Sequence, residues 1–407
     1  MKALNLKFFI RILKFFLGIL LLVPALLQAD LAPMPIIPLP TIVLTVPKPP
    51  HLAAKSYMLV DYLSDYVIAE QNSDQRVEPA SLTKMMTVYI ADQALKSNKI
   101  ALTDKTKVSE YAWRSSGARM FLELNSEPTV EELLKGIVIQ SGNDASITIA
   151  EHIAGSEATF AELMNFYAKQ LGMINTHFVN ATGLPDPNHY TTARDMAILA
   201  KALIRDFPES YKQYSQKEFI YHNIKQSNRN RLLWLNEAVD GIKTGHTDNA
   251  GYCLVASGQK ENMRLIAVLM GAESEALRSA ETNKLINYGF QFYETKKLYS
   301  ALTSLKPARV YMGKEKEINL GLINDLYVTI AKGQFDRLKA NVNVEENLKA
   351  PLKEGAVLGA LSVHLDDKMV AERPLVALTS VEESGFFGRM IDSISMTCRK
   401  LWHKVTS

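Results

Sequence analysis

The chain has 407 residues, with 46 Lys and Arg against 43 Asp and Glu, and a formal net charge of +3. Its 47% hydrophobic and 22% charged residues exclude a disordered chain, and its 20 glycines show no collagen-like triplet period. Two cysteines cannot form a disulfide scaffold, the small net charge gives no reason to expect a nucleic-acid partner, and the length predicts two or three folded units.

The first 29 residues have the pattern of a secretory signal peptide. Four basic residues lie within the first fourteen positions, and a thirteen-residue apolar run follows from Phe15 to Leu27. That run is shorter than the ~20 residues that a helix needs to span a bilayer. Ala29 is a small residue at a suitable cleavage point, and Ala25 offers a second one. An uncleaved N-terminal anchor is the alternative, and both interpretations place the rest of the chain outside the cytoplasm.

Residues 30–51 form a proline-rich segment, and the first folded unit follows over residues 52–296. Seven of the 16 prolines lie between residues 32 and 50, and each lacks a backbone donor. We therefore expect an extended spacer here. The next unit begins with two short apolar runs, at 57–61 and 66–69, which predict a β-hairpin.

Helical patterns dominate from Ser81 to about Arg205. Apolar residues recur at helical spacing after Ser81, and Thr129-Val-Glu-Glu132 is a capping box for a helix that ends near Gln140. Gly155 and Gly172 end two of the helices that follow. These later helices are predicted at about 144–153, 157–171 and 192–205.

The pattern then changes to strands at 252–257 and 264–270, joined by a polar turn at 258–262, with a last helix at about 278–292. This order predicts an α+β fold in which an antiparallel sheet is covered by a helical cluster. Cys253 lies in the first of these strands and is expected to be a small core residue. A disulfide between Cys253 and Cys398 is the alternative in an exported protein.

Residues 297–381 predict a small all-β domain. Short alternating runs occur at 309–311, 326–330 and 339–344, and glycines and charged turns separate them.

Residues 382–407 predict an amphipathic helix that lies on a membrane surface without crossing it. From Phe387 onward, four basic residues accompany a single acidic one, Asp392, and no apolar run approaches the ~20 residues of a spanning helix. A helix docked on the β-rich domain is the alternative. The apolar stripe consists of Phe387, Met390, Ile391, Ile394, Cys398, Leu401, Trp402 and Val405.

The first of three short motifs is Ser81-Leu-Thr-Lys84, at the start of a helix. A spacing of three places both side chains on one helix face. A serine becomes a nucleophile when a base takes its proton, and a lysine can be that base when burial and a nearby cation lower its pKa. Alone the motif is weak, because Ser257-Gly-Gln-Lys260 has the same spacing. That copy runs off a strand into a turn, where the two side chains cannot share a helix face.

The other two motifs are equally weak by themselves. Ser141-Gly142-Asn143 lies between two helices and offers a hydroxyl for proton relay, with an amide that can bind a carbonyl and hold a lysine, but it also suits a plain turn. Lys243-Thr244-Gly245, followed by His246, precedes the strand pair and offers a cation and a hydroxyl for a substrate carboxylate. Gly245 allows another backbone to approach closely. A basic strand start is the alternative.

Together the three motifs are specific. Ser-x-x-Lys, then Ser-x-Asn after 60 residues, then Lys-Thr-Gly after a further 102, have the order and rough spacing of the penicillin-recognising serine acyl-transferases. Over about residues 52–407 the chain resembles the low-molecular-mass penicillin-binding proteins that act as serine-type D-alanyl-D-alanine carboxypeptidases. The resemblance also rests on Glu78–Lys84, Ser141–Asp144, Asn180–Pro185, Thr192–Asp195, Asn228–Asn230 and Asp240–Thr247.

The resemblance implies a β-lactamase/transpeptidase-like fold and a two-step acyl transfer. Ser81 would be the acylated nucleophile and Lys84 its proton acceptor. Ser141 would pass the proton to the leaving D-alanine, and Asn143 would help to bind the peptide. The substrate would be the peptidoglycan stem pentapeptide, with β-lactams as inhibitors and no metal or cofactor. The implied location is the periplasmic face of the bacterial inner membrane.

The remaining implied roles concern the substrate's carboxyl end. Lys243 and Thr244 of the Lys-Thr-Gly motif would hold the terminal carboxylate. Backbone N–H groups of Ser81 and His246 would form the oxyanion hole. Arg278 matches a family arginine near the carboxylate site, although a surface arginine explains it equally well. Arg229 matches another arginine near the cleft.

Three alternatives to the carboxypeptidase remain. A class A β-lactamase shares the outline, but Ser-Gly-Asn replaces its usual Ser-Asp-Asn, no Glu-x-x-Leu-Asn run follows, and the β-rich domain and tail are additional. A D,D-endopeptidase would use the same fold, but such relatives generally lack the C-terminal domain. A wall-binding scaffold with an inactive site is opposed by the three intact motifs.

Overall fold

The structure is a computed structural model that describes residues 46–406, with side chains up to residue 396. The predicted signal peptide and most of the predicted spacer lie outside the described residues. The described end of the spacer, residues 46–51, has no regular secondary structure. The Pro47 carbonyl in it accepts a hydrogen bond from the Tyr288 hydroxyl at 2.8 Å.

Five antiparallel strands form the central sheet, in the order β2-β1-β7-β6-β5. The predicted first hairpin is confirmed. The predicted turn at 258–262 is too long, because strand pairing continues to Lys260 opposite Met263. The strands are β1 (Ser56–Asp61), β2 (Val67–Gln71), β5 (Val239–Thr247), β6 (Gly251–Lys260) and β7 (Met263–Ala272).

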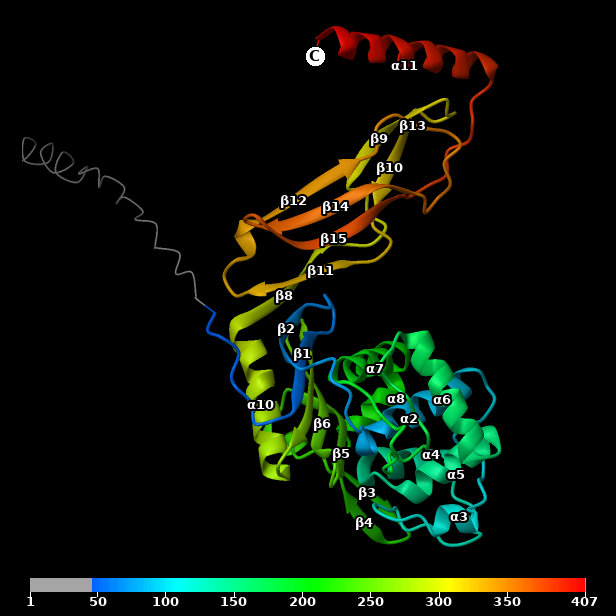
Figure 1. Ribbon diagram of the computed structural model, residues 1–407. Helices are drawn as coiled ribbons and strands as arrows, with labels where there is room; N and C mark the ends of the chain where they lie inside the picture. The colour runs from blue at the N-terminus through cyan, green and yellow to red at the C-terminus, as the bar shows by residue number, and fades with distance from the viewer. Residues whose placement is uncertain (1–45, 407) are drawn as a thin grey trace, which may run out of the picture. The chain divides into compact units, whose positions relative to one another are not determined.

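Helices cover both faces of this sheet, with α10 on one side and the helical cluster on the other (Figure 1). Strand β7 shows why, since its alternate side chains enter two different cores: Ile266 and Val268 the first, Leu265 and Ala267 the second. The longer helices are α2 (Lys84–Lys96), α4 (Val130–Lys135), α5 (Asn143–Ala154), α6 (Glu157–Leu171), α7 (Ala193–Asp206) and α10 (Glu275–Phe292). The short ones are α3 (Glu110–Trp113), α8 (Pro208–Tyr211) and α9 (Leu232–Leu235).

The local helix signals are confirmed where they rest on capping chemistry. The Thr129–Glu132 capping box is present, and Gly155 and Gly172 end their helices in the left-handed region with φ of 78° and 83°. The chain after α4 differs from the prediction, because Gly136–Gln140 forms a π-helical turn. Helix α10 begins earlier than predicted, capped by the Ser274 side chain.

A two-stranded hairpin that was not predicted precedes strand β5 in the chain. It consists of β3 (Glu218–Tyr221) and β4 (Ile224–Ser227), which pair antiparallel.

The C-terminal part is rich in β-strands, as predicted, and ends in helix α11 (Phe386–Thr406). One sheet has the order β12-β14-β15-β10-β9-β13, and β11 pairs with β8, which spans the predicted boundary at residue 297. Among residues 46–406, no helix is long and apolar enough to cross a membrane. The strands are β8 (Tyr293–Tyr299), β9 (Lys306–Tyr311), β10 (Glu317–Gly321), β11 (Leu326–Ala331), β12 (Leu338–Val344), β13 (Leu348–Lys349), β14 (Val357–Leu365) and β15 (Lys368–Ala377).

Candidate active site

Ser81 and Lys84 lie one turn apart, as predicted. Ser81 belongs to a 3-10 turn, Ala80–Thr83, and Lys84 is the first residue of α2. The Lys84 ammonium nitrogen Nζ donates to Ser81 Oγ at 2.9 Å and to the Thr182 carbonyl at 2.5 Å. The second copy of the motif lies entirely within strand β6, which confirms that Ser257 and Lys260 cannot form such a pair.

The environment of Lys84 favours its uncharged form near neutral pH. Its side chain is fully buried, and burial lowers its pKa to about 7, assisted by the nearby Arg229 cation. Asp144 and Glu157 act in the opposite direction. A large share of Lys84 is therefore uncharged near pH 7 and can accept the Ser81 proton.

A loop that carries Thr182 fixes the acceptor of the second Lys84 hydrogen bond. The Asn180 side chain accepts hydrogen bonds from the Thr182 and Gly183 backbone N–H groups. Gly183 has a φ of +84°, and a Cβ there would lie 1.8 Å from the Ala80 carbonyl oxygen. Sequence reasoning matched this segment to the family but assigned no role to Thr182, because a backbone carbonyl leaves no signature in residue type.

Ser141 and Asn143 follow the π-helical turn. Ser141 has a φ of +68°, and its Oγ accepts a 2.9 Å hydrogen bond from Lys243 Nζ. The Asn143 amide nitrogen donates to the Ser116 carbonyl at 2.6 Å. Its oxygen Oδ1 is buried and has no partner among the described residues. The expectation that Asn143 holds a lysine is wrong, because Lys84 binds Ser81 and Thr182 and Lys243 binds Ser141 and the Thr244 carbonyl.

Lys243 lies beneath the cleft on β5, which is one of the two edge strands of the central sheet. It is almost completely buried, and burial lowers its pKa well below the usual range, with further contributions from the Lys84, Arg229 and Arg278 cations. The Arg229 and Arg278 cations at this end of the cleft favour an anion there.

Gly245 brings strand β5 close to the backbone that holds Ser81, which is the close approach that was predicted. A Cβ at Gly245 would lie 3.0 Å from the Pro79 carbonyl oxygen and 3.2 Å from the Leu82 nitrogen. The next residue, His246, stacks on Tyr252 with 4.0 Å between ring centroids. This approach places the backbone around His246 beside the turn that holds Ser81.

Arg278 is a buried cleft residue, so the alternative of a surface arginine is wrong. It is 4% exposed, and it lies one turn inside α10, which begins at Glu275. Its Nη2 lies 3.2 Å from the Glu275 carboxylate and 3.4 Å from the Arg229 carbonyl, while its Nε is buried with no partner among the described residues. Arg229 Nε donates to the Gln140 carbonyl at 2.9 Å.

These residues surround a cleft of about 430 Å³. Lys84 and Lys243 lie behind its wall. Sequence reasoning missed several of the lining residues, because they come from loops that carry no chemical motif. The predicted residues that line the cleft are Ser81, Ser141, Asn143, Arg229, Thr244, Gly245, His246 and Arg278. The missed ones are Gly117, Ala118, Thr182, Gly183, Leu184, Thr247, Tyr252 and Glu275.

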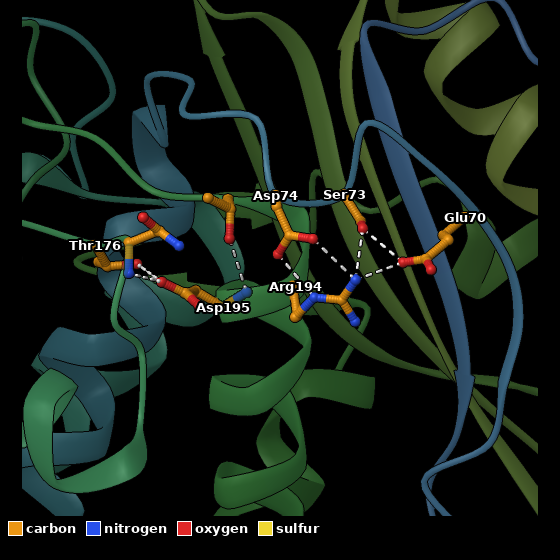
Figure 2. Close-up of polar contacts among 8 residues, drawn as sticks. Glu70, Ser73, Asp74, Thr176, Arg194 and Asp195 are labelled. Carbon is orange, nitrogen blue, oxygen red and sulfur yellow. Dashed lines mark hydrogen bonds and ion pairs between the residues drawn. The ribbon is translucent and has the colours of Figure 1, made fainter.

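The segment Thr192–Asp195, which matches the family, forms ion pairs and hydrogen bonds with neighbouring segments (Figure 2). The Arg194 guanidinium binds both Asp74 and Glu70, at 2.8 and 2.7 Å, and thereby joins α7 to the loop that follows β2. The Asp195 carboxylate accepts a 2.7 Å hydrogen bond from Thr176. These ion pairs attach the segment between β2 and Ser81 to the start of α7.

Two sequence families match the chain. The family described as "D-alanyl-D-alanine carboxypeptidase" matches residues 43–274, and "Penicillin-binding protein 5, C-terminal domain" matches residues 293–383. The chain is 46% identical over 361 residues to the D-alanyl-D-alanine carboxypeptidase DacC of Escherichia coli, which covers 85% of this chain and 89% of that protein. It is 44% identical over 360 residues to DacA of Haemophilus influenzae, covering 87% and 92%.

Solved structures agree with these matches. Penicillin binding protein 5 from Haemophilus influenzae superposes with a TM-score of 0.81 at 45% identity, over 83% of this chain and all of that one. The residues gathered around Ser81 and the matches to both parts of the chain lead to one assignment: the chain belongs to the D-alanyl-D-alanine carboxypeptidase family of low-molecular-mass penicillin-binding proteins.

Proposed function

We propose that this carboxypeptidase removes the terminal D-alanine from peptidoglycan stem pentapeptides through an acyl-enzyme on Ser81. The observation that carries the proposal is the 2.9 Å hydrogen bond between Ser81 Oγ and a buried Lys84 whose pKa is lowered to about 7. In the first step, neutral Lys84 takes the Ser81 proton, and Oγ attacks the carbonyl of the penultimate D-alanine. Backbone N–H groups of Ser81 and His246 stabilise the oxyanion, where a lost donor typically costs ~3 kcal/mol.

Ser141 acts on the leaving group. Its hydroxyl gives a proton to the departing amine as the carbon–nitrogen bond breaks. The proton that Lys84 took from Ser81 replaces it on Ser141, and the terminal D-alanine leaves. The Lys243 ammonium, 2.9 Å from Ser141 Oγ, holds this hydroxyl in place. Water then hydrolyses the Ser81 ester and regenerates the enzyme.

The carboxyl end of the substrate lies at the cationic end of the cleft. Thr244 and Arg278 both line it, and the unpartnered Arg278 Nε is a donor available to the terminal carboxylate. Lys243 supports this carboxylate through its charge, since its ammonium already binds Ser141 and the Thr244 carbonyl. At the other end, the unpartnered Asn143 Oδ1 can accept a hydrogen bond from a substrate amide.

The cleft favours a slow-deacylating enzyme over a β-lactamase. Glu275 is the one carboxylate among the residues that line it, and it is ion-paired with Arg278 at 3.2 Å. It therefore lies at the carboxylate end, away from the position in which a base would activate water on the acyl-enzyme.

Labelled penicillin and mass spectrometry of pentapeptide products test the function together. The chain should hold the label for minutes and convert pentapeptide to tetrapeptide, and Ser81→Ala should do neither. Rapid turnover of the label would identify a β-lactamase, and no labelling would identify an inactive scaffold.

We also propose that the enzyme acts at the periplasmic face of the inner membrane, delivered by residues 1–29 and held there by the tail. The Asp392 carboxylate on α11 accepts hydrogen bonds from the Met312 backbone N–H at 2.6 Å and from Lys316 at 2.9 Å. The polar side of the helix thus binds the turn after β9. The opposite apolar stripe is free in the described part of α11, where its exposed members are Phe387, Met390, Ile391 and Ile394.

Deletion of residues 385–407 tests the tail. We expect the truncated enzyme to remain active and to appear in the soluble periplasmic fraction once cleavage of the signal peptide is verified. A truncated protein that still sediments with membranes would contradict this role of α11.

A further inference from the structure

A buried hydrogen bond joins the turn that holds Ser81 to the loop between α6 and α7. Thr83 ends this 3-10 turn, and its hydroxyl oxygen Oγ1 lies 2.9 Å from the ring nitrogen Nε2 of His189. Thr83 is fully buried and His189 is 2% exposed. The His189 ring packs edge-on against Phe178, with 5.7 Å between the ring centroids. Neither Thr83 nor His189 lines the cleft, so a role for their hydrogen bond in the reaction has to be indirect.

The same loop binds the catalytic lysine. Its Thr182 carbonyl accepts the 2.5 Å hydrogen bond from Lys84 Nζ. The loop and the turn are in close contact at this point, since a Cβ at Gly183 would lie 2.9 Å from Thr83 Oγ1. The hydrogen bond between Thr83 and His189 therefore crosses the same contact as the one from Lys84. Thr83 and Lys84 are adjacent in the chain, so a displacement of Thr83 would also displace Lys84.

His189 is uncharged in the pH range in which Lys84 can accept a proton. Burial lowers the pKa of His189 to about 4, assisted by His177 and Lys84, while Asp186 acts in the opposite direction. The neutral ring can bind the Thr83 hydroxyl with Nε2 as either donor or acceptor. At neutral pH the hydrogen bond therefore joins two uncharged groups and adds no further cation beside Lys84.

We propose that His189 is a positioning residue for the acylation step, and that its hydrogen bond to Thr83 fixes the turn of Ser81 and Lys84 against the loop that binds Lys84. This inference rests on the proposed function, since acylation of Ser81 is the step that it assists. Ser81 Oγ and Lys84 Nζ must stay within hydrogen-bond distance for the proton to pass between them, and small misplacements of reacting groups lower rates strongly. Loss of the bond should therefore slow acylation and leave the initial binding of the substrate unchanged.

Substitutions of His189 in the full-length enzyme test this role. Stopped-flow acylation by a chromogenic β-lactam gives the dissociation constant of the initial complex and the acylation rate constant separately. His189→Leu keeps a side chain of similar size without the hydrogen bond. It should lower the acylation rate constant about fivefold or more, with the dissociation constant changed less than about twofold. His189→Gln retains an amide that can bind the Thr83 hydroxyl, and it should restore the rate constant to within about twofold of the wild type.

Two further variants show whether the effect passes through Thr83. Thr83→Val removes the hydroxyl and keeps the branched shape, so it should lower the acylation rate constant by about the same factor as His189→Leu. The double variant should lose no more than either single one, because all three remove the same interaction. His177→Gln is the matched control on a neighbouring histidine that does not bind Thr83, and it should leave the rate constant unchanged.

Thermal unfolding verifies that each variant is folded. Where His189→Leu does not fold, Thr83→Val alone decides, with a loss of about fivefold supporting the inference and an unchanged rate constant overturning it. Losses that multiply in the double variant would also overturn it, as would a loss confined to the dissociation constant of the initial complex. A wild type that the β-lactam does not acylate would remove the proposed function as well. Normal acylation of the wild type and of both single variants would overturn this inference alone.

Discussion

Two regions of the molecule contain buried polar groups, and they differ in whether those groups have hydrogen-bond partners. In the catalytic cleft, Asn143 Oδ1 and Arg278 Nε are buried and have no partner among the described residues. At the base of the tail helix, the Asp392 side chain is 4% exposed and is surrounded by the Met312 N–H, Lys316 and Arg309. The first arrangement leaves hydrogen bonds for a substrate to complete, and the second already has every one that it needs. Unpaired polar atoms also occur outside the cleft, as at Ser384 Oγ just before the tail helix, so the contrast is between the two cleft atoms and Asp392 itself.

The pKa values of Lys84 and Asp392 are both lowered, but for different reasons. The pKa of Lys84 is lowered to about 7 by burial, so the uncharged amine is favoured there. The pKa of Asp392 is lowered by the hydrogen bond from Lys316, so the carboxylate stays ionised. Between about pH 7 and its ordinary range, Lys84 binds a proton only in the unfolded chain, so its contribution to stability rises with pH. The contribution of Asp392 is present at neutral pH and is lost as pH falls through its lowered pKa.

The largest expected effect is at Ser81. Ser81→Ala should abolish penicillin labelling and D-alanine release, while the free energy of unfolding changes by no more than ~1 kcal/mol. The matched control is Ser257→Ala, which removes the serine of the second Ser-x-x-Lys copy and should label normally. Label on any other serine of the Ser81→Ala protein would contradict the assignment of the nucleophile.

The next largest effect is at Arg278, where a cationic donor is available to the substrate. Arg278→Gln should lower kcat/KM for a peptide with a free carboxylate by about tenfold or more, because charged hydrogen bonds contribute ~1.5–3 kcal/mol. An amidated peptide should lose less. Lys243→Gln is the comparison, since equal losses for the two peptides would mean that Lys243 acts through Ser141 and Lys84. Equal losses in Arg278→Gln would argue against its contact with the carboxylate.

The pH dependence of acylation should follow Lys84. Since only the uncharged amine accepts the Ser81 proton, the acylation rate should rise through pH 7 and fall about tenfold per unit well below it. Arg229 also lowers the pKa of Lys84, so in Arg229→Gln the rise of the acylation rate with pH should move to higher pH. Stopped-flow measurements with a chromogenic β-lactam provide the profile. An unchanged pH dependence in Arg229→Gln would show that the charge of Arg229 does not affect the pKa of Lys84.

The smallest effect on catalysis should come from Asp392. Asp392→Asn weakens the contacts to Lys316 and Arg309, so the tail helix should become more sensitive to limited proteolysis. Penicillin labelling should not change. Lys316→Gln is the matched variant from the other side of the contact. A slower acylation in either variant would show that the two regions are coupled, contrary to the contrast between them.

Structural features that depend on neighbouring residues could be predicted from the sequence. The Thr129–Glu132 capping box and the glycines after α5 and α6 depend only on neighbouring residues, and they appear where predicted. The β3–β4 hairpin was missed because its turn residues, His222 and Asn223, both adopt positive φ without a glycine to indicate it.

Contacts between distant segments were harder to predict. The motif order identified Ser81, Lys84 and Lys243 as a group, because the chemistry requires those residue types. The Thr182 carbonyl and the Ser116 carbonyl that binds Asn143 are backbone groups from loops, and any residue type can supply them. The start of α10 was placed too late because the Ser274 cap was not used, and no local signal indicated that Arg278 is buried.

The π-helical turn Gly136–Gln140 has a consequence for how this chain can vary in length. A π-helical turn holds about one residue more than an α-helical turn, and one residue corresponds to about 100° of rotation along a helix. Deleting a single residue here would restore ordinary winding and turn Ser141 away from Lys243, even though every catalytic residue type is retained. Relatives that keep this chemistry should therefore show no one-residue gap between Thr129 and Ser141, whereas the two-residue turn between β6 and β7 should tolerate added length.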